Sequence, residues 1–303
     1  MNRSLLLLAG FALLLAAPAA AQAPKPEATS LFGKPLYSNP PSADALAKYE
    51  AARKDYEADP KSADKLIWYG RRTAYLGRFN DAIAIFSEGV KKFPADARIL
   101  RHRGHRYVTT RQLDNAIADL TKAHAMIAGK KDEVEPDGAP NAQNIPVSTL
   151  NGNIRYHLAL AYYLKHDWAK AKPIYEEDLK AGGHDDQRIA DSYWYYSVLR
   201  RMGQEKEAAA FLKSIPPKLN LIEGEPYMRV VRLARHDITE AQAMGDGPKG
   251  ATSPAVAYGI ANWHLYSGDR AGAEKRMREL VAGKSWGDFG FIAAESDLAA
   301  GLK

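Results

Sequence analysis

Two histidines three positions apart are the pattern in this sequence that comes nearest to a metal site. His102 and His105 would share one face of a helix, and imidazole is a common zinc ligand. No carboxylate stands between positions 97 and 110. The neighbouring charged residues are Arg98, Arg101, Arg103 and Arg106. Because guanidinium groups repel a cation, we predict no metal and no other cofactor.

Other catalytic patterns are weak in this chain. The sequence has no cysteine, which excludes disulfides, thiolate nucleophiles and thiolate ligands. It contains neither a Gly-x4-Gly-Lys-Ser/Thr phosphate loop nor a His-Glu-x-x-His zinc motif. No pair of acidic residues has a spacing that singles it out for acid–base work. We therefore predict a protein that is not an enzyme, and keep a hydrolase with an unrecognised site as the less favoured alternative.

The segments that would position these side chains recur with a fixed period. Gly70 and Ala82 are followed by Gly104 and Ala116, so that 104 − 70 = 34 and 116 − 82 = 34. Small residues at these positions let two helices approach closely, while large apolar residues at helical spacing fill the seam between them. The period and the pattern resemble the tetratricopeptide repeat.

The resemblance implies an all-α fold, an α-solenoid of stacked antiparallel helix pairs with capping helices. One pair cannot bury its apolar face alone, so the units must stack. We expect repeats near 63–96, 97–128, 152–183, 189–217 and 254–282, and a degenerate pair within 219–245. Helices over 42–58 and 286–298 would cap the two ends.

In tetratricopeptide proteins the first helix of each pair lines a concave groove. Carried over to this chain, the groove residues are Trp68, Arg71, Tyr75, Arg98, Arg101, His102, His105, Tyr156, His157, Tyr193 and Trp194. Arginine binds carboxylates in a bidentate manner, and aromatic side chains anchor interfaces. We expect a protein or peptide partner, with an acidic segment as one option. An envelope glycan stacked on Trp194 is the alternative, and a third interpretation leaves the arginines solvated and the aromatics in the core.

Two other partner classes are not expected. One branch of the tetratricopeptide family binds acidic C-terminal peptides of cytosolic chaperones through a lysine–asparagine clamp. Here Ile67, Arg71 and His102 stand at the corresponding positions, so the clamp is missing. The net charge of +6 is modest for a nucleic-acid-binding protein of this length, and we predict no nucleic-acid partner.

Residues 129–150 interrupt the repeat after its second unit. The stretch is rich in acidic residues and contains three prolines, and loops of this length are usually functional or disordered. One interpretation is an acidic surface loop. The other is a lid beside the groove, held by its apolar end at Ile145–Val147.

The N-terminal residues have the layout of a secretory signal peptide. Arg3 precedes an apolar run over Leu5–Ala17, and small residues follow. This run is shorter than the roughly 20 residues that span a bilayer. We predict a signal peptide over 1–21 (with cleavage after Ala23 as the alternative), a proline-rich lead over 22–41 and the solenoid over 42–303. The mature chain would be periplasmic or secreted, with no transmembrane segment.

Overall fold

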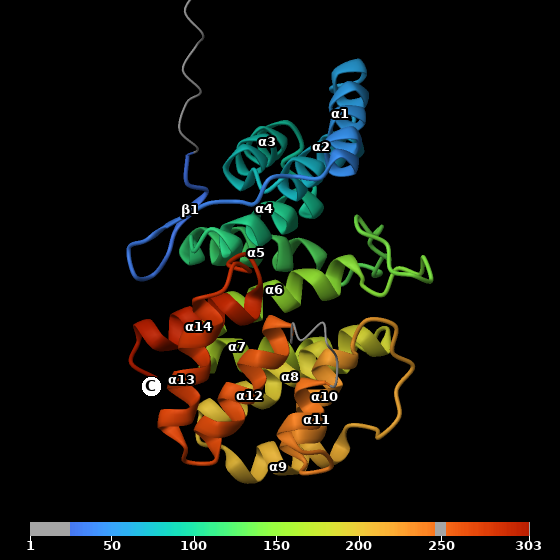
Figure 1. The fold of residues 1–303 in the computed structure, drawn as a ribbon. Helices are drawn as coiled ribbons and strands as arrows, with labels where there is room; N and C mark the ends of the chain where they lie inside the picture. Colours follow the sequence, from blue (N-terminus) through green and yellow to red (C-terminus); the bar gives the residue numbers. More distant parts are fainter. Residues whose placement is uncertain (1–24, 246–252, 303) are drawn as a thin grey trace, which may run out of the picture.

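The described chain is almost entirely helical (Figure 1). The computed structural model describes residues 25–245 and 253–302. Within these ranges it contains fourteen α-helices and one short antiparallel hairpin, formed by β1 (Ala28–Thr29) and β2 (Pro35–Leu36). The all-α fold class predicted from the repeat is confirmed. The predicted signal peptide lies outside the described residues.

The helices follow one another as antiparallel pairs. A capping helix, α1 (Ala43–Ala58), precedes the first pair and packs against it. The pairs are α2 (Ala63–Tyr75) with α3 (Phe79–Lys92), α4 (Ala97–Thr109) with α5 (Leu113–Ile127), α6 (Leu150–Leu164) with α7 (Trp168–Ala181), α8 (Asp185–Arg201) with α9 (Glu205–Ser214), α10 (Glu225–Ala234) with α11 (Glu240–Met244), and α12 (Pro254–Tyr266) with α13 (Arg270–Val281). The last helix is α14 (Phe289–Ala299). The chain is thus an α-solenoid of tetratricopeptide-like helix pairs.

Small residues set the distance between the two helices in each of the first two pairs. A Cβ atom added to Gly70 would lie 2.5 Å from the Phe86 ring, and one added to Gly104 would lie 2.6 Å from Leu120 Cγ. Ala82 and Ala116, from the second helix of each pair, are completely buried. The repeating small residues of the sequence therefore mark where two helix backbones touch.

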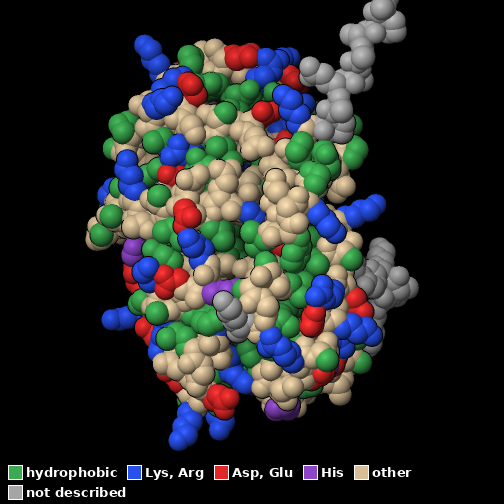
Figure 2. Space-filling view, turned by 90° about the vertical axis from the view of Figure 1, so that its left-hand side faces the viewer, with side chains coloured by type: hydrophobic (Ala, Val, Ile, Leu, Met, Phe, Trp, Pro, Cys, Tyr) green, Lys and Arg blue, Asp and Glu red, His purple; other side chains and the backbone are tan. Residues whose placement is uncertain are grey.

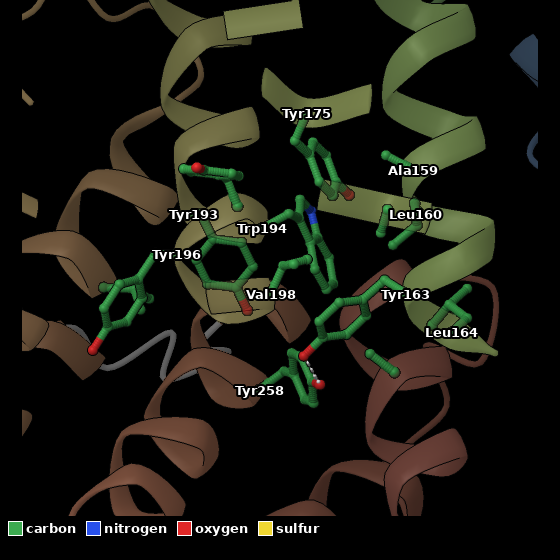
Figure 3. Close-up of a cluster of buried hydrophobic side chains, with 14 of the residues drawn as sticks. Ala159, Leu160, Tyr163, Leu164, Tyr175, Tyr193, Trp194, Tyr196, Val198 and Tyr258 are labelled. Atoms are coloured by element: carbon green, nitrogen blue, oxygen red, sulfur yellow. Dashed lines mark hydrogen bonds between the residues drawn. The ribbon is translucent and has the colours of Figure 1, made fainter. Parts of the chain in front are cut away.

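The largest part of the core lies between α6, α8 and α12 (Figure 3). Trp194 stands at its centre, with its ring edge-on to Tyr163 at 5.1 Å between centroids. The Tyr163 and Tyr258 hydroxyls form a hydrogen bond of 2.7 Å, and the Tyr258 hydroxyl donates to Asp297 of α14 at 2.7 Å. Aromatic side chains from three repeats thus lock the C-terminal half together.

The last helix returns to the first half of the solenoid. In Figure 1, α14 lies beside α6, and it also packs against α12 and α13. Glu295 of α14 accepts a backbone hydrogen bond from Leu31 in the N-terminal hairpin at 2.5 Å, and it forms a buried ion pair of 2.6 Å with Arg111. The Trp286 indole donates to the Tyr37 carbonyl oxygen at 2.8 Å. The two ends of the described chain are therefore fastened to each other.

The outer surface mixes both signs of charge. On the face shown in Figure 2, Lys and Arg side chains alternate with Asp and Glu rather than gathering in one broad patch. Among the described helices none is both long enough and apolar enough to cross a membrane.

Candidate binding groove

The first helices α2, α4 and α6 bring together the cationic part of the predicted groove. Arg71 comes from α2, Arg101 and His102 from α4, and His157 from α6, and all four are buried. His105 and His157 lie with their ring centroids 4.4 Å apart. The spacing of the repeats placed these side chains on one surface, but the chain's own segments cover much of that surface.

Glu135, from the interruption between the second and third pairs, enters the groove. One of its carboxylate oxygens lies 3.0 Å from Arg101 Nε, and the other lies 3.7 Å from His102 Nε2. Its side chain is almost fully buried, whereas the neighbouring Val134 is 63% exposed. The alternation of exposed and buried side chains indicates an extended segment that directs the Glu135 carboxylate toward Arg101.

Backbone contacts hold the acidic segment, residues 133–138, across the groove. The Glu135 N–H donates to the Ser148 carbonyl at 3.0 Å, and the Leu150 N–H donates to the Glu133 carbonyl at 2.8 Å. Arg72 donates to the Gly138 carbonyl at 2.8 Å. A Cβ at Gly138 would overlap the Tyr75 hydroxyl, so a larger residue there would require the Tyr75 side chain to move. The acidic segment is therefore a fitted cover of this groove.

Residues 129–150 lie beside the groove, but the apolar anchor expected for a lid at Ile145–Val147 is wrong. Ile145, in the apolar end that was expected to pack back onto the helices, is 44% exposed. The acidic end packs instead, because Arg101 and Arg72 offer charge and hydrogen-bond donors that an apolar side chain cannot use.

A second segment covers the middle of the groove. Phe289, the first residue of α14, packs against His105 at 5.2 Å, His157 at 5.5 Å and Tyr156 at 6.1 Å between ring centroids. No pattern in the sequence indicated this contact, because α4 and α14 lie in distant parts of the chain. It arises only when the C-terminal helix folds back onto α6.

Tyr193 and Trp194 lie in the core and not on the groove surface. Their exposed fractions are 1% and 0%. The reason is that α8 is enclosed by α6, α7, α9 and α10, so that helix offers no open concave face. Trp194 uses its indole N–H inside the protein, donating to the Tyr156 hydroxyl at 2.9 Å. Assignment of these two residues to a partner-binding surface was wrong.

The open part of the groove lies at its N-terminal end. A cavity of about 260 Å³ is lined by Trp68, Arg71, Arg98 and the acidic segment, among others. The guanidinium of Arg71 stacks over the Trp68 ring at 4.4 Å, and Arg98 pairs with Asp96 and Asp64, each at 2.6 Å. Tyr75 is 42% exposed at the rim.

Burial and crowding of positive charge alter the acid–base properties of the groove. Burial lowers the pKa of His102, His105 and His157 well below the usual value for histidine, and the nearby guanidiniums lower it further. Burial also lowers the pKa of Arg101, and it lowers the pKa of Arg106 to about 10. The imidazoles are therefore neutral near pH 7.

Among the described residues, the candidate metal and Ser-His-Asp groupings do not have the geometry that such sites need. In the described part of the chain, no three His, Asp or Glu residues gather as a metal site. His166 contacts both Ser296 and Asp297, but through the same ring nitrogen, Nε2. A Ser-His-Asp relay needs the two different ring nitrogens, so this cluster does not form one.

A short sequence string matches a hydrolase motif without its structural context. Gly283, Ser285 and Gly287 fit Gly-x-Ser-x-Gly, which in hydrolases places the serine between a strand and a helix. Here the string joins α13 to α14. Ser285 lies on the rim of a cavity of about 480 Å³ that has no histidine in its lining. The Ser285 side chain forms a hydrogen bond with Asp288, whose pKa is raised by burial.

Similar chains were found among solved structures. No protein-family model matches the sequence, and no curated protein matches it. YrrB, described as a TPR protein with an unusual peptide-binding site, is 13% identical, covers 77% of this chain and 92% of its own, and has a TM-score of 0.45. A tetratricopeptide repeat protein from Parabacteroides merdae ATCC 43184 is 13% identical over 83% of this chain and 92% of its own, with a TM-score of 0.46. The structure of Naa15/Naa10 bound to HypK-THB is 19% identical, covers 83% of this chain and 37% of its own, and has a TM-score of 0.38.

Proposed function

We propose that this protein is a scaffold that binds an extended acidic segment of a partner protein along α2 and α4. The observation that supports the proposal is the contact of Glu135 with Arg101 and His102. The chain's own acidic segment lies where a partner would lie, and it is extended, as groove-bound peptides commonly are. A partner segment of the same chemistry would replace it.

The open N-terminal end of the groove supplies the first contact in this proposal. Trp68 and Arg71 line the cavity of about 260 Å³ next to the acidic segment. An incoming chain would meet the stacked indole and guanidinium there before it displaces Glu135. Displacement exchanges one carboxylate for another at Arg101, so the buried charge is paired throughout.

Export belongs to the same proposal. The layout of residues 1–21 supports passage out of the cytoplasm, so the partner would be a periplasmic or secreted protein. A glycan partner has less support, because Trp194, the aromatic side chain on which a sugar was expected to stack, is buried.

The test is binding of a labelled synthetic peptide with the sequence of residues 131–138. We expect the Glu135→Gln variant to bind it at least tenfold more tightly than the wild type, because the intrachain carboxylate no longer competes. Adding Arg101→Gln to that variant should remove most of the gain. Fluorescence anisotropy measures both affinities.

Two controls make the result specific. Arg278→Gln removes an exposed arginine of α13 and should leave the peptide affinity unchanged. A peptide with Gln and Asn in place of its acidic residues should bind weakly to every variant. Equal affinity for the acidic and the neutral peptide would contradict the proposal.

A further inference from the structure

A cavity of about 180 Å³ lies beneath the acidic segment, between that segment and α2 and α4. Its lining includes the guanidiniums of Arg71, Arg101 and Arg106, together with Tyr75, Glu135 and Ser148. The proposed partner peptide does not account for this space, because the cavity exists while the acidic segment is in place.

The arginines that line the cavity carry more positive charge than the carboxylates of the lining neutralise. Arg101 is paired with Glu135. Arg71 and Arg106 form no ion pair with any residue in 25–245 or 253–302, and their charged groups contact aromatic rings instead, Trp68 at 4.4 Å and Phe79 at 5.6 Å. Asp137 also lines the cavity, but one of its oxygens accepts the Ala139 N–H within its own turn. The three guanidiniums of the lining therefore face two carboxylates, those of Glu135 and Asp137, and the lining keeps an excess of positive charge.

The neighbouring groups respond to this excess charge. Besides the effect of burial, Arg71 and Arg101 lower the pKa of Arg106, and Arg71 also lowers the pKa of Arg101. The same arginines lower the pKa of His102. A buried charge is costly unless it is paired and hydrogen-bonded, so a bound anion would relieve a repulsion that the fold itself builds in.

The remaining polar atoms of the lining also suit an anion. The Tyr75 hydroxyl is an available donor at the cavity wall. The Ser148 hydroxyl accepts from Asn153 at 3.0 Å, which leaves its own O–H to donate. A volume of about 180 Å³ is large enough to admit a tetrahedral oxyanion.

We propose that this cavity binds a small oxyanion of the phosphate type, held by Arg71 and Arg106 with Tyr75 and Ser148 as further donors. The excess of positive charge favours an anion, and the planar guanidinium donors match the oxygens of a phosphate in a bidentate manner. The anion would lie between α4 and the acidic segment. It would therefore hold the cover closed, in opposition to the partner peptide.

The experiment is calorimetric titration of the purified chain with inorganic phosphate at constant ionic strength, with chloride as the balancing anion. We expect saturable binding with one site. Arg106→Gln should weaken it at least tenfold, whereas the exposed Arg278→Gln should change it less than twofold. Glu135→Gln should tighten phosphate binding, because it removes a carboxylate beside the site and leaves Arg101 unpaired.

Thermal unfolding separates loss of the site from loss of the fold. Without phosphate, Arg106→Gln should melt at or above the wild-type temperature, because repulsion among the arginines is reduced. With phosphate, the wild type and Arg278→Gln should gain stability, whereas Arg106→Gln should not. Glycerol phosphate forms a second arm: tighter binding of the ester would identify a phosphorylated molecule as the source, and tighter binding of phosphate would identify the free ion.

Three results would overturn the proposal. The first is that the wild type shows no saturable phosphate binding. The second is that Arg106→Gln binds phosphate as tightly as the wild type does. The third is that chloride stabilises the wild type as much as phosphate does. The two experiments have different decisive variants, Arg101→Gln for the peptide and Arg106→Gln for phosphate, so that either proposal can fail by itself.

Discussion

At the scale of single residues, the groove contains more arginine charge than its carboxylates neutralise. Arg101 obtains its carboxylate from Glu135, which belongs to the acidic segment and not to a helix of the array. The three imidazoles beside it carry no charge near pH 7, because burial and the guanidiniums disfavour their protonation. Near pH 7 the positive charge of the groove is therefore carried by its arginines and not by these imidazoles.

The histidines should make the stability of the protein fall in acid. The pKa of His105 is lowered in the folded chain, while an unfolded histidine titrates near pH 6.5. The unfolded state therefore binds more protons below about pH 6.5, and the free energy of unfolding should decrease by up to about 1.4 kcal/mol per pH unit for each such histidine.

Urea unfolding at pH 7.5, 6.0 and 5.0 measures this decline. His105→Phe keeps a ring against His157 and Phe289 and removes one titrating group, so the decline should be shallower in that variant. The same pH dependence in both proteins would show that His105 is not responsible.

At the scale of elements, each helix pair depends on one close crossing. In the second pair the crossing is between Gly104 of α4 and Leu120 of α5. The same pair carries Arg101 and Arg106, so the crossing also fixes the direction in which the groove arginines point. The acidic segment is a different type of element, held by a β-bridge between Val134 and Thr149 and by side chains of α2 and α4.

A larger side chain at this crossing should separate the two helices. Gly104→Val places methyl groups where even a Cβ lies within 2.6 Å of Leu120, and overpacking of this kind costs about 1–3 kcal/mol. Urea denaturation measures the loss. Thr121→Val, an exposed position on α5, is the matched control and should stay within about 0.5 kcal/mol of the wild type. Equal stability of the two variants would argue against a tight crossing.

At the scale of the whole molecule, the solenoid is closed on itself. The N-terminal hairpin, the end of α4 and the C-terminal helix meet at Glu295, which pairs with Arg111 and accepts the Leu31 N–H. This closure places Phe289 in the groove and limits how far the superhelix can open. The open cavity of the groove lies at the α2–α4 end, away from Phe289.

Loss of the charge on Glu295 should loosen the closure. Glu295→Gln leaves Arg111 buried without its carboxylate, and breaking a buried pair in this way costs about 3–5 kcal/mol. Hydrogen exchange should report faster opening of residues 25–41, and urea unfolding should report the loss of stability.

Glu207→Gln is the control for this experiment, because Glu207 is exposed in its pair with Lys172 and exposed pairs contribute about 1 kcal/mol or less. If exchange in residues 25–41 were the same in both variants, the N-terminal hairpin would not depend on Glu295.

The fold could be predicted from the sequence because it rests on local patterns. Gly70 and Ala82, with their counterparts Gly104 and Ala116 in the next unit, mark contacts between helices that are neighbours in the chain. The candidate site could be predicted only in part. Arg71, Arg101 and His102 follow from their places on the first helices, and the acidic character of residues 129–150 drew attention to the segment that contains Glu135.

The amino-acid sequence by itself determined the repeat, the all-α class and the helix faces on which the groove arginines lie, since each depends on spacing within a single repeat. Only the tertiary structure decided which of those faces are open. Trp194 is enclosed because α8 has neighbours on every side, and His105 is covered because α14 returns from the far end of the chain. Burial is a sum over all elements that pack on a residue, so contacts at long sequence separation leave no periodic signal.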